Sequence, residues 1–428
     1  MSYFELDLNL SKEDAALKKE THKFAKEVMR PIAMELDPMT PEEVIAPASP
    51  LWTFMKKAYE LDYHILPFPE DFGGPGLKPI QIQMVMEELA WGSFGLTLML
   101  NTSLDAAVAM GGGEQHINQF TLPYCNCKDG SYIGCWAITE PDHGSDTLVT
   151  GYPEFRDPNI GSQCRATLDG EEWVISGQKS SWISGGTIAK TILLMCQIDA
   201  SKGHAGSGMF LFDLDRPGVS KGKPLDKIGT RELNQGEIFF DNVRVPKSAL
   251  VVGPEDYEDA LAAHLSMTLA MVGTWATGLA RAGFDEALEY ARNRIQGGKP
   301  LVEHKNIQDK LFKMFRQIEA SRQLCRAAFV YNWSHPMNPE KRVIEYSMAA
   351  KTFATQTALD VTSDAIQIFG GYGISREYII EKLFRDARTT LICDGSNDTL
   401  TVVGGKKIAE TYPRQFYKMS KLGKRLHA

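Results

Sequence analysis

The sequence predicts a mainly α-helical protein with a central β domain. Apolar residues recur at helical spacing near both ends of the chain, and short apolar runs alternate with turn residues in the middle. The 428 residues also exceed what one compact core usually holds. We expect an N-terminal helical domain, a middle β domain and a C-terminal helical bundle, over residues 1–130, 131–248 and 249–428.

The N-terminal zone is predicted to consist of helices. Phe24, Val28 and Ile32 follow one another at four-residue spacing, which places them on one helix face. Ser11, followed by acidic residues, is a typical helix start. The Pro- and Gly-rich stretch at residues 66–79 is expected to interrupt the helices as a loop.

The middle zone is predicted to be a small β-barrel or β-sandwich. Asp169 and Gly170 separate the runs CRATL and EEWVIS, and an Asp-Gly pair between such runs is a strong hairpin signal. Further strands are expected over residues 191–198, 208–214 and 236–245.

The C-terminal zone returns to helices, and these are long. Ile307, Leu311, Met314 and Ile318 form a stripe at helical spacing. Such a stripe is typical of the seam of a helix bundle, so we expect these four residues to be plain core.

Composition and charge exclude several classes of function. The net charge of −8 argues against a nucleic-acid partner, which usually requires a basic face. Residues 1–30 lack the apolar segment of a secretory signal, and the longest apolar run, 265–280, is too short for a membrane span. Among seven cysteines, only Cys125 and Cys127 lie close together, without a second pair at zinc spacing. We therefore expect a cytoplasmic protein with reduced thiols and no metal site.

Two segments of the middle zone combine strand and turn character with polar side chains. In WAITEPDHGSD, residues 136–146, a strand runs into a turn whose N–H groups and hydroxyls can face a ligand. In SGQKSSWISGG, residues 176–186, Trp182 lies between serines and can stack on a flat cofactor. Taken alone, the first segment is better explained as an ordinary turn, and a lone Trp on a strand is more often core.

Two further segments lie in the C-terminal zone. DAIQIFGGYG, residues 364–373, can expose backbone to a phosphate or ribityl chain, although taken alone it is better explained as a helix that ends at a left-handed glycine. In ICDGSN, residues 392–397, Asp394 is either a general base tuned by burial or an acid bonded to its own turn.

In their order and spacing, the four segments together resemble the acyl-CoA dehydrogenase family. GEIFFDNVRVP, ATGLARAGFDEALEYARNRIQGGKPLVEHKNIQDKL and EELAWGS extend the resemblance over nearly the whole chain. The resemblance implies a C-terminal four-helix bundle, FAD held between the bundle and the β domain, and a homotetramer. It also implies an acyl-CoA substrate, with electron-transferring flavoprotein as the electron acceptor.

The resemblance also assigns residues to the site. It makes Asp394 the catalytic base and places Ser145, Thr268 and Gly395 at the substrate. Residues expected to border the flavin are Trp136, Ile138, Thr139, Gly144, Ser145, Trp182, Ile183, Ser184, Ser396 and Asn397. Residues expected to reach FAD across a subunit boundary are Arg294, Gln296, Gln367, Gly370 and Gly371.

The mechanism that the resemblance implies is an α,β-dehydrogenation. Hydrogen bonds from the flavin ribityl chain and a backbone N–H polarise the thioester carbonyl and acidify the α-carbon. A carboxylate removes the α-proton while the β-hydride passes to flavin N5. Because those hydrogen bonds strengthen as enolate charge develops, they stabilise the transition state.

The sequence departs from the family pattern at several positions. The base is usually Glu, and the shorter Asp394 sets its oxygens back by about 1 to 1.5 Å, whereas a misplacement near 1 Å costs about 100-fold in rate. Thr268 occupies the position of an alternative Glu base in some relatives. Gly297 replaces a Phe, and one residue more than usual lies between Lys179 and Trp182.

Asp394 leaves alternative functions open. Nitroalkane oxidases share the fold and use Asp with a nearby hydroxyl residue, which Thr268 matches, but their Arg position is Thr401 here. An altered elimination on a bulky, cyclic or unsaturated acyl group is another alternative, and a catalytically silent flavin-binding relative is a third. Residues 96–101 and 264–272 are expected to form the acyl pocket wall, although core packing explains them equally well.

Overall fold

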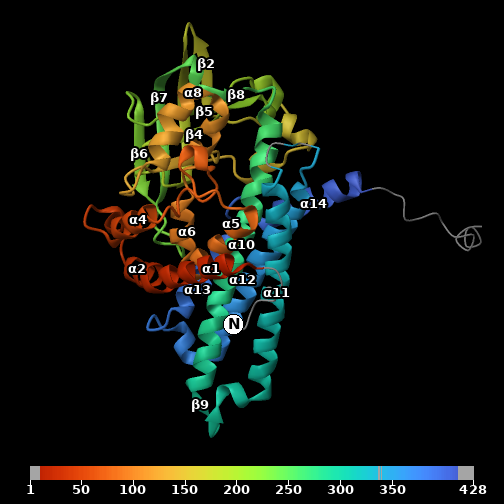
Figure 1. Cartoon of the computed structure of the whole chain (residues 1–428). Helices are drawn as coiled ribbons and strands as arrows, with labels where there is room; N and C mark the ends of the chain where they lie inside the picture. The colour runs from red at the N-terminus through yellow and green to blue at the C-terminus, as the bar shows by residue number, and fades with distance from the viewer. Residues whose placement is uncertain (1–9, 336–337, 339, 413–428) are drawn as a thin grey trace, which may run out of the picture.

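The computed structural model describes residues 10–335, 338 and 340–412. A β-sheet region lies at one end of the molecule, and long helices run from it to the other end (Figure 1). The sequence-predicted order of helices, strands and helices is confirmed.

The N-terminal region folds into helices that pack against both other regions. Ser11 caps the first helix with a capping box, which Asp14 closes. The fifth helix is buried along most of its length, because it lies between the first helix and the bundle. The helices are α1 (Lys12–Phe24), α2 (Arg30–Leu36), α3 (Pro41–Ile45), α4 (Pro50–Glu60), α5 (Pro79–Gly92), α6 (Phe94–Leu100), α7 (Leu104–Ala109), α8 (Glu114–His116) and α9 (Leu122–Cys125).

The middle region is built on one mostly antiparallel sheet. Its strands are β1 (Gly134–Ala137), β2 (Arg165–Asp169), β3 (Glu172–Ser184), β4 (Thr191–Gln197), β5 (Ser207–Asp213), β6 (Val219–Pro224), β7 (Gln235–Pro246) and β8 (Leu250–Val252). They are ordered β6-β7-β3-β2-β4-β5-β8, and β1 runs parallel beside β4. The predicted hairpin is confirmed, with Asp169 opposite Glu172. Every residue of β4 is buried, so this strand forms the centre of the β core.

β3 contains a β-bulge between Lys179 and Ile183, in the segment where one residue more than usual was noted in the sequence. Lys179 of β3 pairs with Ile238 of β7, whereas Ile183 pairs with Gly236, so four steps along β3 match two along β7. A bulge bends a strand and redirects its side chains. Trp182 lies within this bulge and is exposed.

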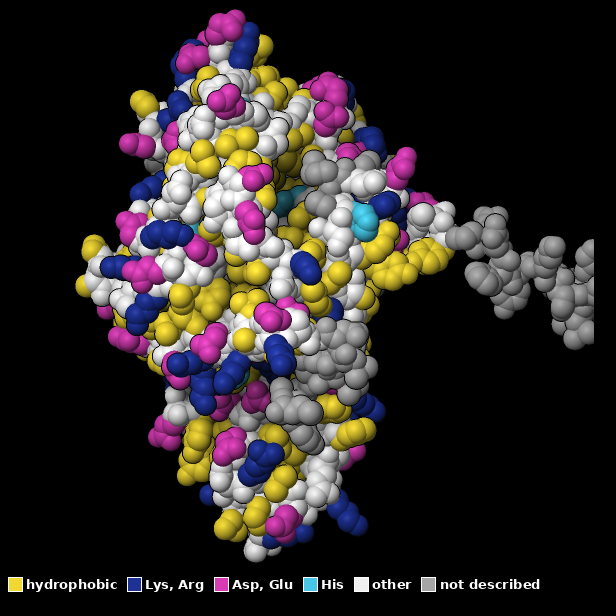
Figure 2. All heavy atoms as spheres, viewed as in Figure 1, with side chains coloured by type: hydrophobic (Ala, Val, Ile, Leu, Met, Phe, Trp, Pro, Cys, Tyr) yellow, Lys and Arg dark blue, Asp and Glu magenta, His cyan; other side chains and the backbone are white. Residues whose placement is uncertain are grey.

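The C-terminal region is a bundle of long helices. They are α10 (Tyr257–Asn293), α11 (Lys305–Trp333), α12 (Ile344–Phe369), α13 (Ile380–Thr390) and α14 (Asn397–Thr411), with the short strands β9 (Ile295–Gln296) and β10 (Lys299–Pro300) after α10. The predicted stripe on α11 is buried, as expected for a seam. Figure 2 shows hydrophobic side chains exposed among charged ones over the helical end of the molecule.

Buried ion pairs connect α5 to the bundle. Glu87 accepts hydrogen bonds from Arg281 at 3.1 Å and from Arg322 at 2.9 Å, and Glu88 pairs with Arg281. Because all four side chains are buried, each charge depends on its partners for stabilisation. Within the described ranges, no helix is both long and apolar enough to cross a membrane.

Candidate active site

A cavity of about 730 Å³ lies between the β-sheet region, α10 and the turn that joins α13 to α14. It collects predicted residues from four distant parts of the chain: Trp136, Ile138, Thr139, Gly144, Ser145, Trp182, Ile183, Ser184, Thr268, Asp394 and Gly395. The surface of its wall is mostly apolar, and hydroxyl, amide and charged side chains among the lining residues can orient a ligand.

Trp182 forms an exposed aromatic platform at the β side of the cavity. Its side chain is 59% exposed, an unusual state for a Trp beside a cavity. The Ser184 hydroxyl and the Trp182 carbonyl are both within hydrogen-bond distance of the Gln235 amide nitrogen, at 3.2 and 3.3 Å. Gln235 thus holds the end of β3, and a flat ring system can cover the Trp182 face.

A buried ion pair joins the first two sequence segments behind this wall. Lys179 Nζ lies 2.6 Å from Glu140 Oε1 and donates to the Ile138 carbonyl at 3.0 Å. Glu140 also accepts hydrogen bonds from the N–H groups of Gln163 and Cys164. Glu140 and Lys179 therefore have a structural role, because they hold the backbone of both segments. Thr139 and Trp182 of the same segments line the cavity.

Asp394 lies on a turn with left-handed backbone conformation. Its φ is +50° and that of Gly395 is +94°. Asp tolerates this region better than most residues, whereas a side chain at Gly395 would contact Leu148 at 2.9 Å. Burial raises the pKa of the Asp394 carboxyl above its ordinary value, and the positive charge of Lys351 offsets part of the increase. A carboxylate with a raised pKa in a cavity has the properties of a general base.

Lys351 of α12 holds the turn that carries Asp394 through hydrogen bonds to its backbone and to Asn397. Its buried ammonium group donates to the Gly395 carbonyl at 2.7 Å, to Asn397 Oδ1 at 2.9 Å and to the Leu391 carbonyl at 3.4 Å. Burial lowers the pKa of Lys351, and the nearby Cys393 and Asp394 oppose that decrease. Lys351 was not predicted from the sequence, because no residue near it in the chain indicates a contact with a turn more than forty residues later.

Ser396 and Asn397 lie beside the cavity without lining it. The Ser396 N–H donates to Ser145 Oγ at 2.9 Å, and its hydroxyl caps α14 by accepting from the Thr399 N–H. The Asn397 amide nitrogen donates to Thr355 Oγ1 at 2.9 Å, in addition to the Lys351 contact at its oxygen. In this structure both side chains therefore hold the turn in place.

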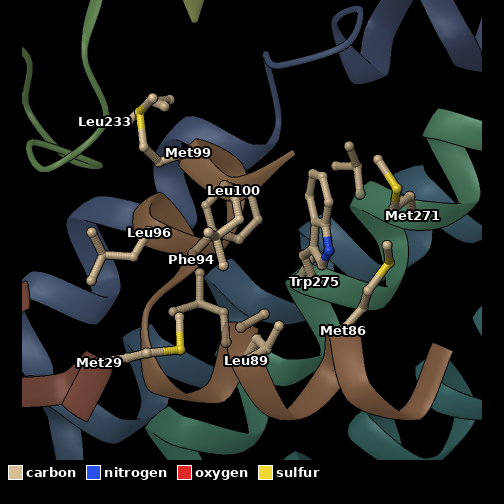
Figure 3. Packing of buried hydrophobic residues seen from close by; sticks show 14 of the residues in the cluster. Met29, Met86, Leu89, Phe94, Leu96, Met99, Leu100, Leu233, Met271 and Trp275 are labelled. Atoms are coloured by element: carbon tan, nitrogen blue, oxygen red, sulfur yellow. The ribbon is translucent and has the colours of Figure 1, made fainter. Parts of the chain in front are cut away.

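Buried aromatic and sulfur-containing side chains form part of the cavity wall. Figure 3 shows Trp275 and Met271 on α10, with Phe94 of α6 on the other side of the Trp275 ring. The Trp275 and Phe94 rings meet edge to face, with centroids 6.3 Å apart. The prediction that residues 96–101 and 264–272 form the pocket wall is confirmed for some of them. Leu98, Asn101, Thr268 and Met271 line the cavity, whereas Leu96 belongs to the hydrophobic core.

A second group of predicted cofactor residues lies at the opposite end of the bundle. Arg294, Gln296, Gln367, Gly370 and Gly371 are all exposed there. Tyr290 near the end of α10 stacks on Phe369 at the end of α12, and the Arg294 guanidinium lies 5.8 Å from the Tyr372 ring, so these segments are neighbours. An α-helix rises about 1.5 Å per residue, so about 25 residues of α10 separate this end from Thr268 by roughly 37 Å.

The connection between β6 and β7 also contributes to the cavity and was not predicted from the sequence. The residues of this connection that line the cavity are Leu225, Asp226, Lys227, Ile228, Thr230 and Leu233. Asp386 of α13 accepts a hydrogen bond of 2.6 Å from the Thr230 N–H, which docks this connection on the bundle. In the sequence, this connection is distinguished only by its position directly before the predicted strand GEIFFDNVRV.

Comparison with known proteins gives one consistent result. Family models described as the N-terminal, middle and C-terminal domains of acyl-CoA dehydrogenase match residues 11–125, 135–243 and 259–408. Rat mitochondrial short-chain specific acyl-CoA dehydrogenase is 31% identical, over 91% of this chain and 88% of its own length. The cyclohexane-1-carbonyl-CoA dehydrogenase of Geobacter metallireducens is 32% identical, over 82% of this chain and 87% of its own length. Among solved structures, butyryl-CoA dehydrogenase from Megasphaera elsdenii has a TM-score of 0.82 at 29% identity, covering 94% of this chain and 100% of its own.

Proposed function

The chain belongs to the acyl-CoA dehydrogenase family, and from that premise we propose that it oxidises an acyl-CoA thioester to the enoyl-CoA with Asp394 as the base. The observation that carries the proposal is the position of Asp394. It is a half-buried carboxylate with a raised pKa, and it shares one cavity with the exposed ring of Trp182.

The residues around the cavity suit FAD, which would supply the hydride acceptor when bound. The exposed face of Trp182 offers a stacking surface, and Thr139, Ser145 and Ser184 add hydroxyl groups along the same wall. The backbone of this wall is held by the Glu140–Lys179 pair, so these groups are arranged before any ligand binds. A fixed polar wall of this kind needs no reorganisation on cofactor binding.

Asp394 would accept the α-proton of the acyl group. Its raised pKa makes it a better proton acceptor than an ordinary carboxylate, while the positive charge of Lys351 favours the ionised form that can accept the proton. The left-handed φ of +50° is a conformation that Asp adopts more readily than Glu. The backbone conformation of this turn is therefore compatible with Asp in place of the usual Glu.

The acyl group is proposed to be compact, either short or cyclic. Trp275 and Phe94 line the cavity, and both are almost completely buried in the core behind it. A long linear chain would have to displace these rings. A relative at 32% identity is named for the cyclohexane-1-carbonyl thioester, a compact cyclic acyl group.

A homotetramer with shared cofactor sites is part of the proposal. Arg294, Gln296, Gln367, Gly370 and Gly371 lie far from the cavity of their own chain, so we assign them to the FAD of a neighbouring subunit. Exposed Ile295, Phe312 and Ile374 at the same end suit a subunit contact. Electron-transferring flavoprotein is the proposed acceptor, and seven free thiols suit a reducing cytoplasm.

An anaerobic titration of the purified protein with acyl-CoA thioesters tests the function. The panel contains butyryl-, isobutyryl-, cyclohexanecarbonyl-, phenylpropionyl- and palmitoyl-CoA, with nitroethane alongside. The proposal predicts that a short or cyclic thioester bleaches the flavin absorbance and that palmitoyl-CoA and nitroethane do not.

Two outcomes would contradict the proposal. Bleaching by nitroethane alone would indicate nitroalkane chemistry, although Thr401 at the expected Arg position is exposed and bonds the Asn397 carbonyl. A yellow protein that no thioester bleaches would indicate a silent relative.

A further inference from the structure

Two histidines converge on one carboxylate beside the candidate active site. His143 and Asp146 belong to the loop after β1, and His204 belongs to the connection between β4 and β5. His143 Nδ1 lies 2.7 Å from Asp146 Oδ2, and His204 Nε2 lies 3.4 Å from the same oxygen. The three ligand atoms all lie within 4.8 Å of one another. None of them takes part in the proposed dehydrogenation.

The donor set is typical of a transition-metal site. Neutral imidazole nitrogens suit zinc and its neighbours in the first transition row, whereas calcium and magnesium prefer sites made of oxygen alone. With Zn–N bonds of about 2.0 to 2.1 Å, two ligands of a tetrahedral site lie about 3.3 Å apart. The His204–Asp146 distance of 3.4 Å already matches this value, and the His143–Asp146 pair would have to separate slightly.

The surrounding contacts orient these ligands. His204 is only 2% exposed, and its other ring nitrogen, Nδ1, lies 3.3 Å from the Ser162 hydroxyl. Metal-binding histidines usually make such a contact through the nitrogen that is not a ligand, because it fixes the tautomer and the ring orientation. Asp146 Oδ1 accepts from the Gly144 N–H at 2.6 Å, which leaves Oδ2 directed at both imidazoles.

We propose that His143, Asp146 and His204 bind one zinc ion per chain, with water as the fourth ligand. The Asp146 side chain is 42% exposed, so both the ion and the water have access from solvent. The site has three protein ligands and one open position.

The ion would connect two loops next to the flavin wall. Asp146 immediately follows Ser145, whose hydroxyl accepts from the Ser396 N–H in the Asp394 turn. Zinc at this position would join the loop after β1 to the β4–β5 connection and restrict the movement of Ser145. Its role is separate from proton or hydride transfer.

Metal binding to the untagged, full-length holoenzyme tests the proposal directly. After treatment with a chelator and removal of it, the protein is titrated with ZnCl₂ by calorimetry, and with CoCl₂ while visible absorption is recorded. We expect one ion per chain, a tetrahedral cobalt spectrum and a rise in thermal midpoint with zinc.

Variants separate this site from adventitious binding. Asp146→Asn preserves size, and His143→Gln is a second variant in case the first does not fold. Each should weaken zinc binding by at least about 100-fold. His335→Ala, at a histidine beyond the end of α11, and Cys127→Ser are matched controls that should bind zinc normally. Failure to bind one ion per chain, or unchanged affinity in both Asp146→Asn and His143→Gln, would overturn the proposal in favour of a metal-free hydrogen-bonded triad.

Discussion

The hydroxyl oxygen of Ser145 accepts a hydrogen bond of 2.9 Å from the backbone N–H of Ser396, across 251 residues of chain. Ser145 lines the cavity in the loop after β1, and Ser396 follows the turn that carries Asp394. The bond therefore fixes the distance between the proposed flavin wall and the proposed base.

Removing this bond should affect the reaction more than the fold. We expect Ser145→Ala to lower stability by only about 1 kcal/mol, the usual net value of one hydrogen bond. Flavin reduction by the best thioester should slow by roughly tenfold or more, because small displacements of reacting groups are costly. Stopped-flow reduction and urea unfolding measure the two effects. Ser334→Ala, on the exposed end of α11, is the control, and equal reduction rates in the two variants would refute the positioning role.

Lys351→Met should shift the pH dependence of flavin reduction to higher pH. Burial raises the pKa of Asp394, and the Lys351 charge limits the increase, so removing that charge should raise the pKa further. The base must be ionised, and activity is lost as pH falls through its pKa, so the acidic limb moves upward. Lys351→Arg keeps the charge and should retain most of the wild-type profile. An acidic limb at an unchanged pH in Lys351→Met would show that Lys351 has no electrostatic effect on the base.

Trp182→Ala should reduce flavin binding without destabilising the chain. The side chain is 59% exposed, so its removal leaves no core cavity, whereas loss of a stacking surface should cost roughly 1 kcal/mol or more in affinity. Flavin content after gel filtration and fluorescence titration with FAD report the change. Leu168→Ala, at an exposed apolar residue of β2, is the matched control, and it should keep its flavin. If both variants retain flavin equally, Trp182 is not the platform.

Glu88→Gln should destabilise the fold at neutral pH. Burial opposes ionisation of Glu88, but the Arg281 charge and hydrogen bonds from His22 and Arg281 outweigh it and lower the pKa to about 2. Because the folded pKa lies below the unfolded value near 4.3, this stabilisation is present above about pH 4.5 and is lost as pH falls toward 2.

The expected loss is about 3 to 5 kcal/mol at pH 7, the usual cost of breaking a buried pair, and the difference from wild type should shrink as pH falls below about 4. Urea unfolding at several pH values measures it. Glu60→Gln, in an exposed pair with Lys56, should change stability by less than about 0.5 kcal/mol. A difference between Glu88→Gln and wild type that does not depend on pH would contradict the assignment.

Local patterns were sufficient for most of the fold. The Asp169-Gly170 turn predicted the β2–β3 hairpin, and the stripe containing Met314 and Ile318 predicted the α11 seam, because period and turn chemistry depend on neighbours in the chain. The bulge before Ile183 was visible only as one additional residue. Its effect on Trp182 depends on pairing with β7, which local sequence does not specify.

The site was predictable only where its residues belong to motifs. Asp394, Thr139 and Trp182 do, and the structure brings them to one cavity. Lys351 does not, because its role arises from three contacts with a turn distant in sequence. His204 is likewise outside the motifs, and only tertiary structure brings it to His143 and Asp146 of the segment at residues 136–146.

The central claim is that Asp394 removes the α-proton, and anaerobic stopped-flow reduction of Asp394→Asn tests it most directly. The variant is isosteric and should keep its FAD, while the rate of flavin reduction by the best thioester should fall by about 100-fold to 10,000-fold, the usual contribution of a general base. Reduction at a rate near that of the wild type, with FAD fully bound, would contradict the assignment and require another base.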